Sequence, residues 1–211
     1  MRFLQFVSIV LLLNSCTPAV YKKLQRAEGD GACIRQFRPH IERALYQASV
    51  DVAGNHLSGI LLIKRMPDSS SRIVFTNEAG FTFFDFEFSG SRGFVVHSII
   101  SKMDKEAVRK TLRKDFELLL MNVADTPAAA AVFRKEDTCY YAYNTGSDVY
   151  YYITDVRCSQ LIRMERGNTR KKVVEATRGP LKDGVPESMN IRHTNFNFVI
   201  DLKRIYDHAE E

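Results

Sequence analysis

Several signatures of enzyme chemistry are missing from this 211-residue sequence. No serine stands in a G-x-S-x-G elbow, no H-E-x-x-H motif occurs, and no glycine-rich phosphate-binding loop is present. The five histidines are dispersed, and no two cysteines or histidines have the spacing of metal ligands. We therefore do not expect an enzyme, and we expect no catalytic residue, no cofactor and no metal site.

A concentration of charge of one sign is also missing. The formal net charge of +5 is spread over most of the chain, with acids and bases interleaved. The densest basic run, residues 109–114, falls on a helical pattern whose apolar residues point elsewhere, which is typical of a solvated helix face. We expect no nucleic-acid partner.

The sequence has no apolar run long enough for a permanent membrane span, which needs about 20 residues. Its longest apolar stretch, residues 3–13, is interrupted by Gln5 and Ser8, follows the positive start Met1-Arg2, and ends at small or polar residues. This layout is typical of a secretory signal. We expect residues 1–15 to be a signal peptide that directs export and is then removed.

The end of that segment, Leu13-Asn14-Ser15-Cys16, resembles the lipobox of bacterial lipoproteins. The resemblance implies that Cys16 becomes the mature N-terminus and carries acyl chains such as palmitate. Each buried methylene contributes about 0.8 kcal/mol, so three chains would anchor the protein to the membrane almost permanently. Thr17 is not the aspartate that retains such proteins at the inner membrane, so the resemblance implies the outer membrane, facing the periplasm. The alternative is an ordinary secretory signal followed by an incidental cysteine.

The remaining chain predicts one domain behind a tether. Residues 16–32 are polar, with Gly29 and Gly31 near their end, and predict a lipidated tether. Residues 33–211 then form a single domain, since their number suits one hydrophobic core.

Strand-like runs separated by turn residues predict two antiparallel meanders. The first contains residues 57–66, 72–76, 81–88 and 94–100, and the second contains residues 138–143, 149–154, 158–165, 170–177, 187–193 and 196–202. Between them, residues 101–122 have helical periodicity, with cap-like positions at Ser101 and Asp104, and Thr126-Pro127 opens a short alanine-rich helical turn. Residues 37–52 fit either a helix or a strand, and we expect their second half to be extended.

Residues 81–88, FTFFDFEF, concentrate five phenylalanines. In a strand Phe84, Phe86 and Phe88 share one face, whereas Phe81 and Phe83 share the other. The neighbouring runs are also apolar on both faces, and such a sheet requires cover on both sides. We therefore expect an α+β fold, a curved antiparallel sheet (incomplete β-barrel) with the helical insertion acting as plug or lid. The candidates to line its interior are Phe84, Phe86, Phe88, Ile60, Leu62, Phe116, Phe196 and Phe198.

This arrangement of meander, helical insertion and second meander resembles the LolA/LolB family of lipoprotein carriers and receptors. The local similarities are the Ser58-Gly59 step into a long apolar strand and the ending Val185-Pro186-Glu187-Ser188-Met189-Asn190-Ile191, followed by residues 196–202. The resemblance implies an incomplete barrel that binds acyl chains, with an acylated protein or a lipid as its ligand. The alternative is a structural or interaction lipoprotein with a filled core and no ligand, because protein interiors are usually close-packed.

Two further groups of residues leave alternatives open. Asp85 and Glu87 project from one strand face about 7 Å apart, a spacing compatible with paired-carboxylate catalysis but common on solvated strands. The second aromatic concentration comprises Tyr140, Tyr141, Tyr143, Tyr150, Tyr151 and Tyr152. We expect half of these rings to face the core and half to lie on the surface, and the alternative is a site for a sugar or a partner protein.

Three cysteines remain after Cys16, an odd number in a compartment that permits disulfides. Cys139 and Cys158 lie on segments that are candidates for neighbouring strands, so we expect a disulfide between them. The alternative is that Cys33, Cys139 and Cys158 are all buried thiols.

Overall fold

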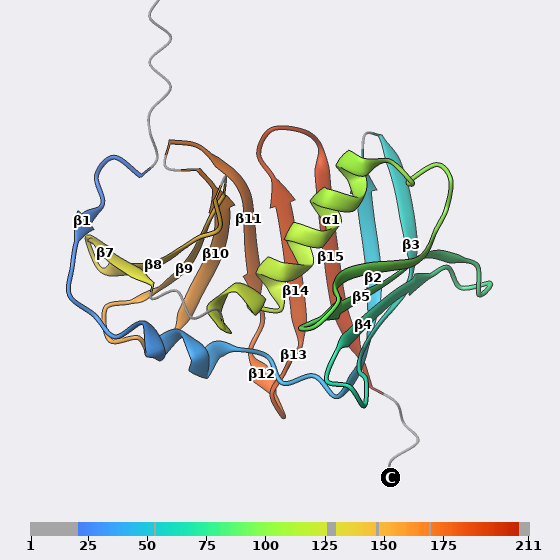
Figure 1. The fold of residues 1–211 in the computed structure, drawn as a ribbon, viewed down its shortest axis with the longest axis horizontal. Helices are drawn as coiled ribbons and strands as arrows, with labels where there is room; N and C mark the ends of the chain where they lie inside the picture. Colours follow the sequence, from blue (N-terminus) through green and yellow to red (C-terminus); the bar gives the residue numbers. More distant parts are fainter. Residues whose placement is uncertain (1–20, 53, 126–129, 147, 169, 207–211) are drawn as a thin grey trace, which may run out of the picture.

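The structure is a computed structural model that describes residues 21–52, 54–125, 130–146, 148–168 and 170–206. A curved antiparallel sheet of thirteen strands dominates it, and one helix, α1, lies across the concave face (Figure 1). The strand order is β1-β7-β8-β9-β10-β11-β14-β15-β2-β3-β4-β5-β6, and the two end strands do not pair with each other. Within the described residues the fold is therefore an α+β incomplete barrel with a helical insertion, which confirms the predicted class.

The first meander forms one half of the sheet. Its strands are β2 (Arg43–Val52), β3 (Asn55–Arg65), β4 (Ser71–Thr76), β5 (Thr82–Ser89) and β6 (Gly93–Ile99). Close backbone approach explains the predicted Ser58-Gly59 step, because a Cβ on Gly59 would lie 1.9 Å from the carbonyl oxygen of Thr76. Extended structure in the second half of residues 37–52 is also confirmed.

The second meander forms the other half. Its strands are β7 (Ala131–Lys135), β8 (Thr138–Asn144), β9 (Val149–Asp155), β10 (Leu161–Gly167), β11 (Lys172–Arg178), β14 (Ser188–His193) and β15 (Phe198–Ile205), with the small ribbon β12 (Leu181–Lys182) and β13 (Val185–Pro186) before β14. The last strand, β15, pairs with β2 and so joins the two meanders. All these pairings are antiparallel.

The predicted alanine-rich helical turn is wrong where it can be compared. Residues 126–129 lie outside the described residues, but Ala131 and Val132 belong to strand β7 and pair with Ala142 and Tyr141 of β8. The side chain of Val132 is buried in the hydrophobic core. Strand pairing and burial therefore override the helix propensity of the alanines.

Helix α1 (Glu106–Leu119) lies inside the predicted range and is shorter. Its N-cap is Lys105, which makes no side-chain cap hydrogen bond, so neither Ser101 nor Asp104 caps it as expected. The 3₁₀ helix η2 (Asn122–Asp125) follows it. Among the described residues, no helix combines the length and apolar character needed to cross a membrane.

The leading segment is part of the domain, which corrects the predicted tether of residues 16–32. From Tyr21 onward it packs on the sheet: β1 (Gln25–Arg26) pairs with β7, and the 3₁₀ helix η1 (Gly31–Phe37) buries Ile34 and Phe37. Residues 16–20 lie outside the described part. The segment is mostly polar, and this composition suggested a tether. The few apolar residues within it are nevertheless enough to pack it on the domain.

The disulfide also differs from the predicted pair. Cys158 is bonded to Cys33, with the Cα atoms 6.4 Å apart, and Cys139 is a free, half-buried thiol. Cys139 pairs across the ladder with Thr154, whereas Cys158 lies beyond the end of β9 in the turn before β10. That turn presents Cys158 to η1 instead of to β8.

Candidate functional site

The interior of the incomplete barrel is filled by aromatic and aliphatic side chains. Phe84 and Phe86 stack with ring centroids 4.4 Å apart, and the Phe116 ring of α1 meets Phe84 at 5.9 Å and Phe88 at 6.5 Å. The structure thus brings together four of the predicted lining residues. Phe84, Phe86 and Phe116 are buried against one another, so this ring cluster is packed and is not the wall of an open chamber.

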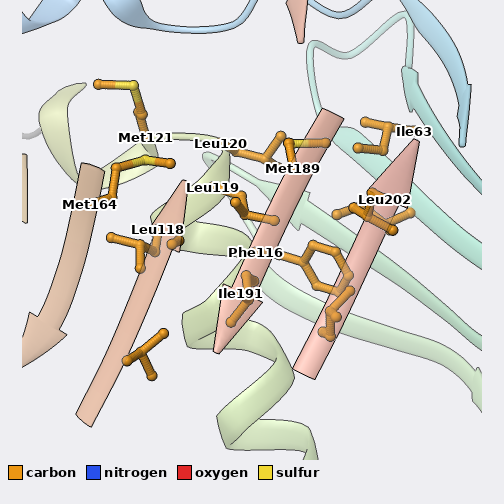
Figure 2. Packing of buried hydrophobic residues seen from close by; sticks show 14 of the residues in the cluster. Ile63, Phe116, Leu118, Leu119, Leu120, Met121, Met164, Met189, Ile191 and Leu202 are labelled. Carbon is orange, nitrogen blue, oxygen red and sulfur yellow. The ribbon is translucent and has the colours of Figure 1, made fainter. Parts of the chain in front are cut away.

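The C-terminal part of helix α1, from Leu112 to Leu119, is packed into the same core. Figure 2 shows Phe116 and residues 118–121 among Met189, Ile191 and Leu202, whose strands form the floor of the concave face. Helix α1 and the residues that follow it therefore fill the concave face at this point.

Two predicted lining residues, Ile60 and Leu62, are on the wrong face of β3. Their neighbours Leu61 and Ile63 are buried inside, because Leu61 pairs with Phe75 and Phe75 pairs with Phe84 in the same inward row. Ile60 and Leu62 are half-buried on the outer face. Since β3 is apolar at both odd and even positions, its sequence alone could not assign the phase.

Phe198 and Phe196 also differ from each other. Phe198 is buried on β15, as expected of a lining residue, whereas Phe196 lies in the β14–β15 turn and is 44% exposed. The ring of Phe196 stacks on Phe198 at 5.8 Å and meets His193 at 4.7 Å. Phe196 therefore covers one end of the interior and does not line it.

A buried charged trio, which we define as Asp115, Arg166 and His193, joins α1 to the sheet. Nη2 of Arg166 donates to Oδ1 of Asp115 at 3.1 Å, and Nε2 of His193 lies 2.8 Å from Oδ2. Asp115 is 0% exposed, and the other two side chains are buried as well. Nε of Arg166 and Nδ1 of His193 have no hydrogen-bond partner among the described residues. Removing one partner from a buried ion pair is strongly destabilising, because the remaining charge stays buried without a counter-charge.

Sequence reasoning missed this trio, although one of its members could have been found. Asp115 stands next to Phe116 and three residues after Leu112, within the apolar stripe of the helix. A carboxylate in that position requires a buried partner. Its partners come from β10 and β14, and nothing in the sequence of those strands identifies them.

A groove of about 560 Å³ opens beside α1 at the mouth of the barrel. It lies between α1, β6 and the β8–β9 turn, and it is lined by Phe94, Val96, Glu106, Arg109, Lys110, Arg113, Lys114, Glu117, Thr145, Asp148 and Tyr150. Burial raises the pKa of Tyr150, and the nearby Glu117 carboxylate, which accepts its hydrogen bond at 3.2 Å, acts in the same direction. Tyr150 is therefore a neutral hydroxyl near physiological pH.

The candidate carboxylate pair lies on the outer face of the first meander, away from this groove. Arg72 binds Asp85 through two nitrogens, at 2.5 and 2.7 Å. Glu87 is bound by Arg92 at 2.5 Å and by His97 at 2.7 Å. The hydrogen bond from His97 is the main cause that lowers the pKa of Glu87. Each of the two carboxylates is thus bound by a different set of basic side chains. We call these contacts the outer ion pairs.

The tyrosines differ from the prediction, because all six rings around the β8–β9 hairpin are buried. Some face the interior, whereas Tyr140 and Tyr151 face outward and are covered by Tyr21 of the leading segment. Tyr21 stacks on Tyr151 at 4.3 Å, and its hydroxyl donates to Oε2 of Glu165 at 2.8 Å. Burial raises the pKa of Tyr21. The outward rings therefore have a partner within the chain.

Comparisons with known proteins add little to this geometry. No protein-family model matches the sequence, and no curated protein shows significant similarity to it. Among solved structures, the chain is similar to a crystal structure of a DUF1329 family protein from Desulfovibrio piger, with 10% identity, a TM-score of 0.45, and coverage of 86% of this chain and 92% of that chain. A likeness at this level supports no conclusion about function, which must rest on the residues of this chain.

Proposed function

We propose that this chain is a lipid-anchored envelope protein that binds an acyl chain, or a similarly apolar ligand, in its incomplete barrel when α1 moves off the concave face. One observation carries the proposal. Helix α1 covers the apolar concave face without contributing to the strand ladder, so it can move while every strand pairing stays intact. An acylated protein or a lipid is the partner class, and no nucleic acid is involved.

The free energy of burying an acyl chain is similar to the free energy of burying the apolar side chains of α1. Helix α1 buries four large apolar side chains, Leu112, Phe116, Leu118 and Leu119, whose burial is worth about 6–12 kcal/mol at about 1.5–3 kcal/mol each. An acyl chain with about fourteen methylenes would recover about 11 kcal/mol at about 0.8 kcal/mol each. A ligand chain can therefore replace the helix with little net loss of apolar burial.

The buried charged trio opposes this exchange. It fixes α1 at Asp115, one turn before the C-terminal end of the helix, to two strands of the second meander. Moving α1 separates these charges, so the closed form is favoured until a ligand is present. We propose that the trio acts as a latch, in the sense that its ion pairs hold α1 on the concave face in the absence of a ligand.

The anchored location follows from the residues at the start of the chain. The signal-like residues 1–15 and the lipobox ending at Cys16 support export and acylation. We propose a location at the outer membrane, facing the periplasm.

A second candidate function is a structural or interaction lipoprotein that binds no ligand. The packed ring cluster favours it, since Phe84, Phe86, Phe88 and Phe116 fill the interior and the groove lies beside α1, outside that cluster. In this candidate α1 is a permanent part of the core.

The test compares acyl-chain binding by the wild type, Asp115→Asn and Asp104→Asn. Asp104 is an exposed carboxylate before α1, paired with Arg109, and is the matched control. If α1 is a latched plug, Asp115→Asn binds a fluorescent fatty acid more tightly than the wild type and Asp104→Asn does not. Mass spectrometry of lipid extracted from the purified protein gives a second measurement. Absence of both extracted lipid and fatty-acid binding in all three folded proteins would reject the carrier and favour the filled-core candidate.

A further inference from the structure

The described chain is fastened to the domain from its first residue. Tyr21 is only 7% exposed, stacked on Tyr151 and hydrogen-bonded to Glu165. Six residues later, the N–H of Ala27 donates to the carbonyl oxygen of Val132 at 3.0 Å. The segment between them runs along the second meander as β1. Residues 21–27 are therefore attached to the domain at both ends, so they cannot lengthen the connection between Cys16 and the domain.

The chain that remains between this attachment and the proposed anchor is short. Cys16 precedes Tyr21 by five residues. Five residues span at most about 18 Å even when fully extended. If Cys16 carries acyl chains in a bilayer, Tyr21 must lie close to the lipid headgroups. Such a domain cannot hang free of the membrane and must rest against it.

The attachment point selects which end of the sheet comes near the bilayer. Tyr21 contacts Glu165, which lies two residues before the end of β10 at Gly167. The antiparallel registers place the β10–β11 turn at the same end of the sheet as the β14–β15 and β2–β3 turns. Figure 1 shows these three turns along its upper edge, with the start of the coloured chain beside β10 and β11. We call this edge the leash end.

The described residues of the leash end have the chemistry of a lipid-binding surface. Lys22, Lys23, Arg170 and Lys171 are all exposed there. No acid occurs among the described residues of segments 22–23, 168–171 and 194–197, and the half-exposed Asp51 beside the β2–β3 turn is paired with His56 at 2.7 Å. Lysines and arginines near an anionic bilayer are attracted to it. The same end carries the exposed ring of Phe196, and a single exposed aromatic side chain would mean little without the charges and the short chain.

We infer that the leash end is a membrane-contacting surface that binds anionic phospholipid headgroups through these four cations and inserts Phe196 among them. This inference rests on the proposed acylation of Cys16. It goes beyond the anchor, because it fixes the orientation of the domain. The mouth of the groove beside α1 includes Thr145 and Asp148 of the β8–β9 turn, which the registers place at the same end, so the groove would open close to the bilayer.

The absence of tryptophan from the sequence makes the orientation measurable. Phe196→Trp places a single indole at the leash end, and Tyr206→Trp places one at the opposite end, where Tyr206 is also an exposed aromatic residue. Both full-length proteins are produced in bacteria, and the mass of each mature protein shows whether Cys16 is acylated. They are then incorporated into vesicles of mixed phosphatidylethanolamine and phosphatidylglycerol, with and without brominated chains.

We expect the indole emission of the Phe196→Trp protein to shift to shorter wavelength and to be largely quenched by brominated lipid, while the emission of the Tyr206→Trp protein is unchanged. Adding Arg170→Glu and Lys171→Glu to the Phe196→Trp protein should remove most of its quenching, although the protein still floats with the vesicles. Equal quenching of the two probes, or no quenching of the Phe196→Trp probe in floating protein, would overturn the inference and leave the anchor intact. Protein that lacks the acyl mass and does not float would overturn the proposed anchor, and this inference with it.

Discussion

The two meanders differ in which kinds of residue occupy their inner and outer faces. The first is apolar on its inner face, where Phe84 and Phe86 stack, and carries the outer ion pairs on the other. The second has charged groups inside, at Arg166 and His193, and buried tyrosines outside, at Tyr151 and Tyr140. Only the second therefore needs a cover on its outer face, and the leading segment supplies it.

The difference shows what determines whether a sheet face needs shelter. Residues 81–88 have phenylalanines at both odd and even positions, yet Phe81 is exposed, and the outward side is completed by ion pairs in which Asp85 and Glu87 are largely covered by their basic partners. A face with good ion pairs and scattered apolar residues is stable in water. A face of adjacent tyrosine rings is not, and it recruits a cover from elsewhere in the chain.

The largest expected effect concerns the disulfide that pins this cover. It closes a separation of 125 residues, and in the chain-entropy account a loop of that size stabilises the fold by about 4–5 kcal/mol. We expect Cys33→Ala to lower the free energy of unfolding by about that amount in urea titrations. Cys139→Ala is the matched control and should change stability little, since Cys139 is free. Equal losses in the two variants would contradict the assignment.

The next effect belongs to the interior shared by the first meander and α1. Phe116 is fully buried against Phe84 and Phe88. Phe116→Ala should cost about 3–5 kcal/mol, because it opens a cavity in a packed core. Phe196→Ala serves as the comparison and should cost much less, since that ring is half outside. Chemical unfolding of the two variants under the same conditions measures the difference.

A smaller effect is expected at the cover of the second meander. Tyr21→Ala removes the ring from Tyr151 and should cost about 2 kcal/mol of unfolding free energy. Glu165 keeps Arg163 as its partner at 2.7 Å, so no buried charge is left alone. Tyr21→Phe keeps the stacking and should lose about 1 kcal/mol with the hydrogen bond. Amide hydrogen exchange should show faster exchange confined to β1 and β7, and uniform acceleration over the sheet would contradict the local role.

The smallest effect is a pH dependence at the outer ion pairs. The pKa of Glu87 is lowered in the folded protein, mainly by the hydrogen bond from His97. Its ionised form therefore stabilises the fold above the ordinary glutamate pKa of about 4.3, and this contribution is lost as the pH falls through the lowered value. The difference in free energy of unfolding between the wild type and Glu87→Gln should therefore decrease as the pH falls below about 4.3. Glu78→Gln, at an exposed turn glutamate, should show no such decrease.

Much of the fold could be predicted from local pattern, because turn residues and alternation determine where strands begin and end. Strand β9, for example, was expected at residues 149–154 and is Val149–Asp155. What failed depended on long-range pairing. The phase of β3 is set by Phe75 on the next strand, Cys158 bonds to a residue 125 positions earlier, and Asp115 meets partners on two distant strands. Nothing local distinguishes these outcomes from their alternatives.

The position of β15 has a consequence for the order in which the molecule can assemble. Strand β15 lies between β14 and β2, so within the described sheet the two halves are joined through the strand that follows all the others in the chain. A nascent chain stopped before residue 198 would hold two separate half-sheets with unpaired edges, because no earlier strand can take that place. The complete sheet can therefore form only after Phe198–Ile205 have been synthesised, because the pairing of β15 with β2 is a contact between residues far apart in the sequence.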